Sequence, residues 1–373
     1  MEPLKNHISQ ALIELTAHHI SQHMPDFDAP HFLSMTVDAL PMLELKARVT
    51  LIADALHALL PKDSAARFCI LAAVLHPDDH TKAQAQSDTD GLCGWGVWPL
   101  TELVGTYGLD DFEAALALLK EMTKRGTAEF AVRPFIIADQ ARAFAIFNSW
   151  RDDPNHHVRR LLSEGTRPRL PWGVRLQNLV QDPDPGLRLI EHLKDDPSEY
   201  VRRSVANHLN DVAKDHPNTV SALAQSWLKD ASPDRERLLR HACRTLIKQG
   251  HAPTLSAFGY GTPKIIEPEL HISPEKVAFG ASLQMHLGLR SDHSAAQPLI
   301  IDYVIHFRKS NGSLSPKVFK WTKIDLAPGE SRDLSKAHPF IPITVRRYYP
   351  GPHKVTIRIN GIDFGSKPFD LLI

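Results

Sequence analysis

The sequence has few cysteines, no long apolar run and no excess of charge, and each absence removes a class of protein. Three cysteines, Cys69, Cys93 and Cys243, occur among 373 residues. They form no C-x-x-C pair, which argues against a disulfide-rich secreted scaffold and a thiolate zinc site and fits a reducing cytoplasm. The longest apolar run, near residues 68–75, is far shorter than the ~20 residues of a membrane span. The first 20 residues are amphipathic, so we expect no secretory signal.

Positive and negative charges balance over the whole chain, so a nucleic-acid hypothesis has to rest on local clusters. There are 43 Lys+Arg and 43 Asp+Glu residues. Residues 120–175 depart from this balance, with 11 basic and 6 acidic side chains. This region is therefore the first place to look for contact with a polyanion.

Two hydrophobic periodicities divide the chain near residue 262. Before this point apolar residues recur at helical spacing, as at Phe112, Ala115, Leu116 and Leu119. After it they alternate with polar residues, and turn signals such as Asn360-Gly361 separate the runs. About seven short strands fit there, the size of an immunoglobulin-like sandwich. We therefore predict a multidomain α + β chain with a helical domain over 1–258, a linker over 259–264 and a β-sandwich over 265–373.

The helical part contains an internal repeat with a spacing of 43 residues. The segment 152–160, DDPNHHVRR, matches 195–203, DDPSEYVRR, and 230–240 is a looser third copy. The acid is expected to cap or approach a helix N-terminus and the proline to open the first turn. A period near 40 residues with paired helices is typical of HEAT repeats, which stack into a curved α-solenoid. A plain antiparallel bundle is the alternative.

The arginine pairs of the repeats fall on equivalent helix faces. Arg203 and Asp211 share one stripe at i and i+8, and Arg160 and Glu164 align at i and i+4. On a single helix such a stripe is most simply a solvated face with salt bridges. Because this stripe recurs on successive repeats, it is also the pattern expected of a surface that follows DNA.

The same region resembles a known family at several stretches. The most distinctive is 158–172, VRRLLSEGTRPRLPW, which combines Arg-Arg, Ser-Glu-Gly and Leu-Pro-Trp. It resembles the bacterial AlkC-type DNA alkylation-repair glycosylases, relatives of the AlkD type, which are built from HEAT-like repeats. The similarity spans most of residues 1–250, and the predicted sandwich looks like the C-terminal immunoglobulin-like extension of one subgroup. Further matching stretches are 98–104, 121–125, 129–134, 167–172, 201–211 and 240–250.

The resemblance implies hydrolysis of the N-glycosidic bond of a cationic alkylated base in double-stranded DNA. The implied lesions are 3-methyladenine and, for this branch, 3-methylcytosine or 1-methyladenine, handled without full flipping of the base. Such a base leaves as a neutral molecule, so the remaining task is to stabilise an oxocarbenium-like sugar and place a water, which a carboxylate can do. The acids that match the family's active site are Glu129, Glu164 and Asp211.

Each of these residues also has a purely structural interpretation. Glu164 could be only the i+4 partner of an arginine, and Asp211 could be a capping or turn residue. Glu129 could pair with Arg133 or lie near a helix N-terminus. Trp172 is expected either to contact the lesion or sugar as an aromatic wall or to pack between helices. Trp95 and its neighbour at position 98 are expected in the core.

Basic side chains of both domains are expected to contact the DNA backbone. In the sandwich these lie in loop segments that also contain aromatic residues, and ordinary solvated loops are the alternative. The candidate contacts are Arg159, Arg160, Arg202, Arg203 and Arg244 in the helical domain and Arg346 and Arg347 in the sandwich.

No cofactor and no metal are expected. Although there are 21 histidines, pairs such as His156-His157 are adjacent and cannot act as i,i+4 ligands. No G-x-x-x-x-G-K-[ST] or G-x-S-x-G motif is present, so nucleotide hydrolysis and serine-esterase chemistry lack support. Nothing around Lys248 indicates the depressed pKa of a Schiff-base nucleophile, which favours a monofunctional hydrolase.

We expect a monomer in the cytoplasm with no membrane contact, because one protein wrapped around one duplex needs no second copy. The alternative is a non-enzymatic HEAT-repeat protein that recognises DNA shape or serves as a protein scaffold. Release of free base from methylated DNA separates these possibilities.

Overall fold

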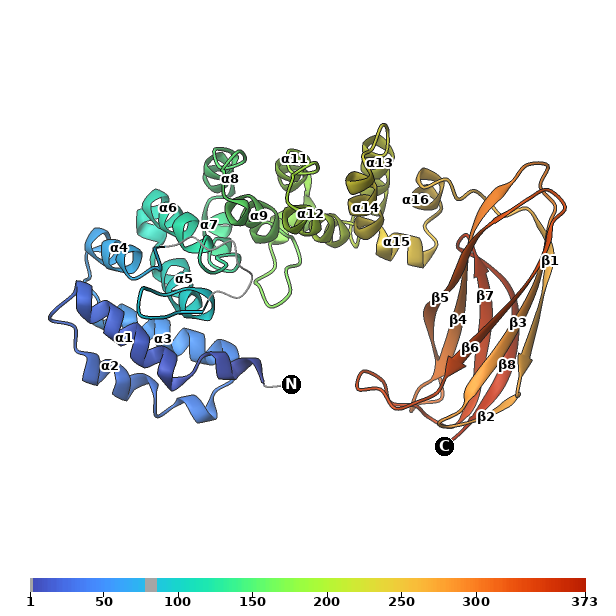
Figure 1. Ribbon diagram of the computed structural model, residues 1–373, viewed down its shortest axis with the longest axis horizontal. Helices are drawn as coiled ribbons and strands as arrows, with labels where there is room; N and C mark the ends of the chain where they lie inside the picture. Colours follow the sequence, from blue (N-terminus) through green and yellow to red (C-terminus); the bar gives the residue numbers. More distant parts are fainter. Residues whose placement is uncertain (1–2, 78–85) are drawn as a thin grey trace. The chain divides into compact units, whose positions relative to one another are not determined.

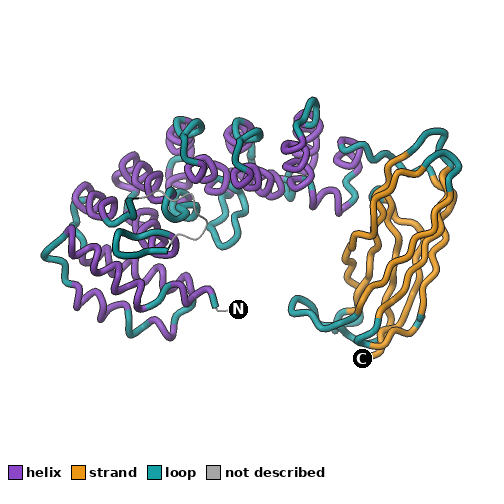
Figure 2. Tube along the Cα trace, in the orientation of Figure 1, coloured by secondary structure: helices purple, strands orange, loops and turns teal. Residues whose placement is uncertain are grey.

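The computed structural model describes residues 3–77 and 86–373 and confirms the predicted fold class. Helices occupy the chain up to residue 257 and strands follow from residue 265 (Figures 1 and 2). Contacts divide the chain into a first unit, residues 1–215 and 233–242, and a second unit, residues 216–232 and 243–373. Among the described residues, no helix is both long and apolar enough to cross a membrane.

The regular elements described in the first unit are all helices. Helices α9, α12 and α14 pack side by side in chain order, and α11 packs against α9 (Figure 1). Four 3-10 helices, η1 (Leu4–His7), η2 (Leu40–Met42), η3 (Gly94–Gly96) and η4 (Leu109–Asp111), connect the longer elements. The α-helices of this unit are α1 (Gln10–His23), α2 (Ala29–Thr36), α3 (Leu45–Leu59), α4 (Ser64–Ala73), α5 (Val97–Tyr107), α6 (Phe112–Thr123), α7 (Arg133–Ala138), α8 (Gln140–Asn148), α9 (His156–Gly165), α10 (Gln177–Gln181), α11 (Asp184–Glu191), α12 (Glu199–Val212) and α14 (Pro233–Ala242).

The repeated acid-proline segments form turns just before α9 and α12. The Asp153 carboxylate accepts from the backbone N–H of Asn155 at 2.9 Å, and Asp196 accepts from Ser198 at 2.8 Å. Asn155 itself caps α9 by accepting from the N–H of His157. The acids thus approach the helix starts as expected, but the prolines precede the helices instead of opening their first turn, because the residue after each proline takes the cap position.

The same acids join successive repeats through buried or half-buried ion pairs. In each pair a cation from one repeat reaches an acid at the start of a following helix: Asp153 and Asp196 stand before α9 and α12, and Asp234 lies in the first turn of α14. Arg159 also donates through Nη1 to the carbonyls of residues 153 and 154, and Arg202 repeats this arrangement with residues 196 and 197. The pairs are Lys120–Asp153, Arg159–Asp196 and Arg202–Asp234, with N···O distances of 2.7, 2.6 and 3.0 Å.

The second unit holds three helices and a β-sandwich. One sheet has the order β1-β3-β6 and the other β2-β8-β7-β4-β5, with all pairs antiparallel except β2-β8. Eight strands are present where about seven were expected. The elements are α13 (Pro217–Trp227), α15 (Arg244–Gln249), α16 (Ala252–Ala257), β1 (Ile265–Ser273), β2 (Lys276–Ala278), β3 (Ser282–Ser291), β4 (Gln297–Arg308), β5 (Leu314–Leu326), β6 (Ser331–Pro339), β7 (Gly351–Ile359) and β8 (Ile362–Leu372).

The predicted alternation produces the core of the sandwich. Leu283, Met285, Leu287 and Leu289 on β3 are all buried, while the residues between them are exposed or half-buried. They pack with residues of β4, β7 and β8 in one apolar cluster. The pattern read from the sequence therefore decides which face of each strand is buried.

Helices α15 and α16 belong with the sandwich because they pack on it. A Cβ on Gly250, at the end of α15, would lie 2.6 Å from the Cα of Gly361 in the β7–β8 turn. Both glycines have φ near +80°, a conformation that other residues rarely adopt. Ile300 packs against Leu255 and Tyr260 close by.

Removing the acid of one repeat should destabilise the first unit. In an Asp196→Ala variant Arg159 loses its carboxylate partner in a half-buried place, so we expect the free energy of unfolding to fall by about 2–3 kcal/mol. Urea unfolding of the full chain, followed by far-ultraviolet circular dichroism, measures this change. Arg188→Ala removes an exposed i,i+4 pair with Asp184 and should change the same quantity by less than about 0.5 kcal/mol. Equal effects of the two variants would contradict a structural role for the repeated ion pair.

Candidate active site

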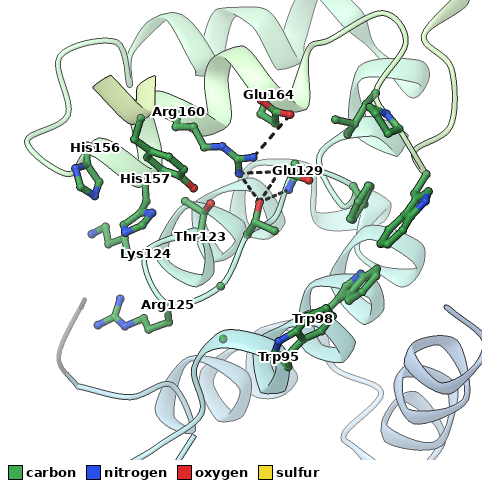
Figure 3. Close-up of a pocket in the computed structure, with 18 of the residues that line it drawn as sticks. Trp95, Trp98, Thr123, Lys124, Arg125, Glu129, His156, His157, Arg160 and Glu164 are labelled. Atoms are coloured by element: carbon green, nitrogen blue, oxygen red, sulfur yellow. Dashed lines mark hydrogen bonds and ion pairs between the residues drawn. The ribbon is translucent and has the colours of Figure 1, made fainter. Parts of the chain in front are cut away.

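A cavity of about 1110 Å³ lies within the first unit. Its walls come from η3 and α5, the segment 123–130, α9, the loop 166–176 between α9 and α10, and Tyr200 on α12. Aromatic rings and charged side chains face each other across it (Figure 3). Such a mixture of apolar surface and a few converging charges is typical of a binding or catalytic site.

Arg160 joins two of the predicted acids at this cavity. Its Nη1 lies 2.6 Å from an oxygen of Glu129, and its Nη2 lies 3.7 Å from one of Glu164 (Figure 3). Nη1 also donates to the hydroxyl of Thr127, and the guanidinium lies 5.1 Å from the centre of the Tyr200 ring. Glu129, Glu164 and Arg160 are therefore neighbours in space although they come from two segments of the chain.

Glu164 is buried and remains ionised. Its Oε1 accepts from Nη1 of Arg167 at 2.6 Å and its Oε2 accepts from the hydroxyl of Ser204 at 2.6 Å. Burial by itself would raise the pKa of this carboxyl, but the charges of Arg160 and Arg167 and the hydrogen bond from Ser204 outweigh burial and lower the pKa. A negative charge is thus held at the wall of the cavity at neutral pH.

Arg167 connects Glu164 to the third predicted acid. Its Nε donates to Oδ2 of Asp211 at 2.8 Å while its Nη1 holds Glu164. Asp211 is only 2% exposed and also accepts from Lys214 at 2.9 Å. One guanidinium that lines the cavity therefore bridges two carboxylates from two successive repeats.

The observed contacts test the structural interpretations of the three predicted acids. Glu129 is paired with Arg160, and the alternative pair with Arg133 does not form. Because α7 begins at Arg133 and residues 129–132 form turns, the two are not one helical turn apart. Glu164 bonds more closely to Arg167 than to its i−4 arginine. Asp211 is a buried residue in the last turn of α12 and not a turn residue.

Trp172 lies at the cavity with 58% of its surface exposed, so packing between helices does not account for it. Its φ is 65°, in the left-handed region. For a residue with a bulky side chain this conformation costs on the order of 1 kcal/mol and persists only where neighbouring contacts hold it. Lys46 supplies one such contact by donating to the Trp172 carbonyl at 2.7 Å.

Several residues that line the cavity were not predicted to do so from the sequence. Trp95 and Trp98 were expected in the core, but they are half-buried and line the cavity, where Trp98 stacks on Phe130 with ring centres 5.5 Å apart. Arg167 and Tyr200 were not singled out at all. Arg167 could have been found from its place three residues after Glu164 within the most distinctive stretch, whereas Tyr200 left no signal.

The predicted DNA-binding arginines lie in different surroundings. Arg159 and Arg202 bind acids and carbonyls between repeats, as described above. Arg203 is exposed and pairs with Glu199 on its own helix. Arg244 begins α15 in the second unit. In the loop between β6 and β7, Arg346 lies over Phe307 at 3.8 Å and Arg347 over Tyr349 at 5.6 Å. Apart from Arg160, these arginines do not line the cavity.

One group of potential metal ligands occurs among the residues described. The ligand atoms of His76, Asp88 and Asp90 lie within 4.8 Å of one another, and both acids are exposed. Exposed acidic groups are common without an ion. We assign no metal to this group, and chemistry without a metal remains a prediction.

The depressed pKa of Glu164 predicts a pH-dependent contribution to stability. A carboxyl with a lowered pKa stabilises the fold above its unfolded value of 4.5, and this contribution disappears as pH falls through the folded value. When the pH is lowered from 7 to 3.5, the Tm of the Glu164→Gln variant should therefore fall by less than the Tm of the unaltered protein. Differential scanning calorimetry at both pH values tests this, with Glu191→Gln on the exposed face of α11 as the control for one lost carboxylate. Equal losses in the unaltered protein and Glu164→Gln would contradict the buried ion.

Comparison with known proteins agrees with this geometry. A family model described as the C-terminal Ig-like domain of uncharacterised protein YhaZ matches residues 267–373. The uncharacterised protein YhaZ of Bacillus subtilis (strain 168) is 35% identical over 373 residues, which cover 97% of each chain. The structure of the Pseudomonas fluorescens alkylpurine DNA glycosylase AlkC, bound to DNA containing an abasic site analog, matches with a TM-score of 0.87 and 35% identity over 100% of both chains. The chain therefore belongs to the AlkC-type family of DNA glycosylases, in the subgroup with a C-terminal immunoglobulin-like domain.

Proposed function

We propose that this protein hydrolyses the N-glycosidic bond between deoxyribose and a cationic alkylated base in double-stranded DNA. The observation that carries the proposal is the single guanidinium of Arg167, which lines the cavity and holds two buried carboxylates. One of them, Glu164, lines the cavity as well, whereas Asp211 is buried and does not. The similarity to a DNA-bound alkylpurine DNA glycosylase over the whole chain supports the same reaction.

The proposed reaction depends on a negative charge near the sugar more than on a proton donor. An alkylated base is already positively charged and departs as a neutral molecule, so protonation by the enzyme contributes little. As the bond breaks, positive charge develops on the sugar, and a fixed carboxylate in a site of low dielectric stabilises that charge. Because its pKa is lowered, Glu164 is in the required ionised form.

The arginines allow the acids to work beside a polyanion. Three carboxylates alone would repel DNA phosphates, but Arg160 pairs with Glu129 and Arg167 pairs with the other two. The site is thus close to neutral as a whole while the carboxylate oxygens remain local sites of negative charge. We assign Glu164 and Asp211 to stabilising the sugar cation and orienting water, Glu129 to supporting them through Arg160, and Trp172 to contact with the lesion or sugar.

The finer features of the activity follow as parts of the proposal. We propose 3-methyladenine as a substrate, with 3-methylcytosine or 1-methyladenine as further lesions, and excision without full flipping of the base. We also propose that the enzyme is a monofunctional hydrolase. We propose a monomer that acts in the cytoplasm and a boundary between glycosylase domain and sandwich at 259–264. Further phosphate contacts are assigned to Arg203, Arg244, Arg346 and Arg347.

The alternative is a protein that binds damaged DNA by its shape without cleaving it, which HEAT-type repeats would also allow. Incubation with methylated DNA and detection of free base by chromatography separates the two. Binding without release would favour the shape-binding protein.

Loss of either buried acid should abolish excision while DNA remains bound. Glu164→Gln and Asp211→Asn keep the shape of the side chain and remove the charge that stabilises the sugar, so the rate of base release should fall by about 10²-fold or more. The control, Asp215→Asn, makes the same chemical change at a half-exposed acid that pairs with Arg169 instead of Arg167. Single-turnover release of methylated base and affinity for undamaged duplex are measured together. Excision at the unaltered rate in both variants would remove these acids from the mechanism.

Arg203 should contribute one phosphate contact. Its side chain is 62% exposed and pairs with Glu199 on the same helix, α12. Arg203→Ala should therefore reduce the slope of log affinity against log salt by about one. Arg188→Ala removes an arginine of an i,i+4 pair on α11 whose side chain is 82% exposed and should leave the slope unchanged. Titrations of labelled duplex at several salt concentrations give both slopes, and the role is wrong if Arg203→Ala has the slope of the unaltered protein.

A further inference from the structure

A fully buried arginine outside the predicted site holds the loop 166–176. Arg133, the first residue of α7, donates through Nη1 to the carbonyls of Gly165 and Arg167, both at 2.9 Å, and through Nε to the carbonyl of Val174 at 2.6 Å. These three acceptors span the loop from the end of α9 almost to its last residue. One side chain therefore fixes both ends of the loop.

Burial of Arg133 at this position is unfavourable for folding stability. In the part of the chain that the structure describes it forms no ion pair, and its Nη2 has no hydrogen-bond partner. Burial, with the charge of Arg167 nearby, lowers the pKa of Arg133 to about 10. A buried cation without a counterion destabilises a fold, so its presence points to a role in arranging the carbonyls that it binds.

Lys46 fixes the same loop from a distant part of the sequence. This exposed residue of α3 donates to the carbonyl of Trp172, 126 positions away, at 2.7 Å. The next residue, Gly173, packs so closely on Arg133 that a Cβ there would lie 3.2 Å from Nε. The backbone at Trp172 is thus held on one side by Lys46 and on the other by Arg133, which explains how φ of 65° is maintained.

Two side chains at the cavity depend on this loop. Arg167 offers its carbonyl to Arg133 and its guanidinium to both Glu164 and Asp211. Trp172 lies at the cavity with its backbone carbonyl bound to Lys46. We propose that Arg133 and Lys46 are positioning residues that keep the loop 166–176 in place, so that Arg167 bridges the two acids and Trp172 is presented to the bound DNA. This inference rests on the function proposed above.

The proposal is tested with Arg133→Lys and Lys46→Met in the full chain. A lysine at 133 keeps the charge but cannot reach three carbonyls, so single-turnover release of methylated base should slow by about tenfold or more, because small misplacements of catalytic groups have large effects on rate. Lys46→Met should slow the same release by about threefold. Affinity for duplex with an abasic analog should change by less than about twofold in Arg133→Lys, since that change leaves net charge alone. Lys62→Met, at an exposed position of the same unit, controls for the loss of one lysine.

A second readout follows the loop directly and does not need activity. Acrylamide quenching of Trp172 is obtained as the difference between each protein and its Trp172→Phe counterpart, since the chain has six tryptophans. Quenching should increase in both variants and stay unchanged in Lys62→Met. If Arg133→Lys does not fold, Lys46→Met alone decides, because its side chain is exposed.

The outcomes separate this inference from the proposed function. Slower release with increased quenching supports it. Release and quenching equal to those of the unaltered protein overturn it, and so does a weaker affinity of Lys46→Met with an unchanged release rate, which would make Lys46 a simple phosphate contact. If the unaltered protein releases no base, the proposed function fails, while the quenching still shows whether the two cations hold the loop.

Discussion

The site depends on one guanidinium shared by two carboxylates. Glu164 and Asp211 are buried, and a buried carboxylate is stable as an ion only when a cation and hydrogen bonds replace the lost water. Arg167 meets this need for both acids with bonds of 2.6 and 2.8 Å. The acids come from two repeats, so the bridge forms only where the repeats are packed in one particular register.

The repeat spacing explains why an arginine has to lie between the acids. Glu164 and Asp211 are separated by 47 positions, one repeat of 43 and one further helical turn. The two acids are therefore not at equivalent places in their repeats, and no direct stacking of equivalent side chains brings them together. The ion pairs Arg159–Asp196 and Arg202–Asp234 fix the register between repeats, and within that register the Arg167 side chain spans the remaining offset.

The periodic features of the fold could be predicted from the sequence, whereas contacts between segments that lie far apart in the chain could not. The repeat, the alternation on β3 and the acids at positions 129, 164 and 211 follow from spacing or from a family-like motif, and the structure brings these three acids into one connected network. The alternative in which Glu129 pairs with Arg133 does not hold because spacing arguments apply only within one helix, and α7 begins at Arg133 itself. The contact between Lys46 and Trp172 joins residues 126 positions apart, so no local pattern could indicate it.

Several costly features of the first unit gather around the same loop. Arg133 is buried without a counterion, Trp172 has a left-handed backbone, and Glu164 and Asp211 are buried acids. A chain that needed only to fold could replace each of them with an apolar side chain or a glycine and gain stability. Their concentration within one loop and two helix ends therefore argues that this part of the fold is maintained for chemistry, whereas the ion pairs that recur between successive repeats are sufficiently explained by packing.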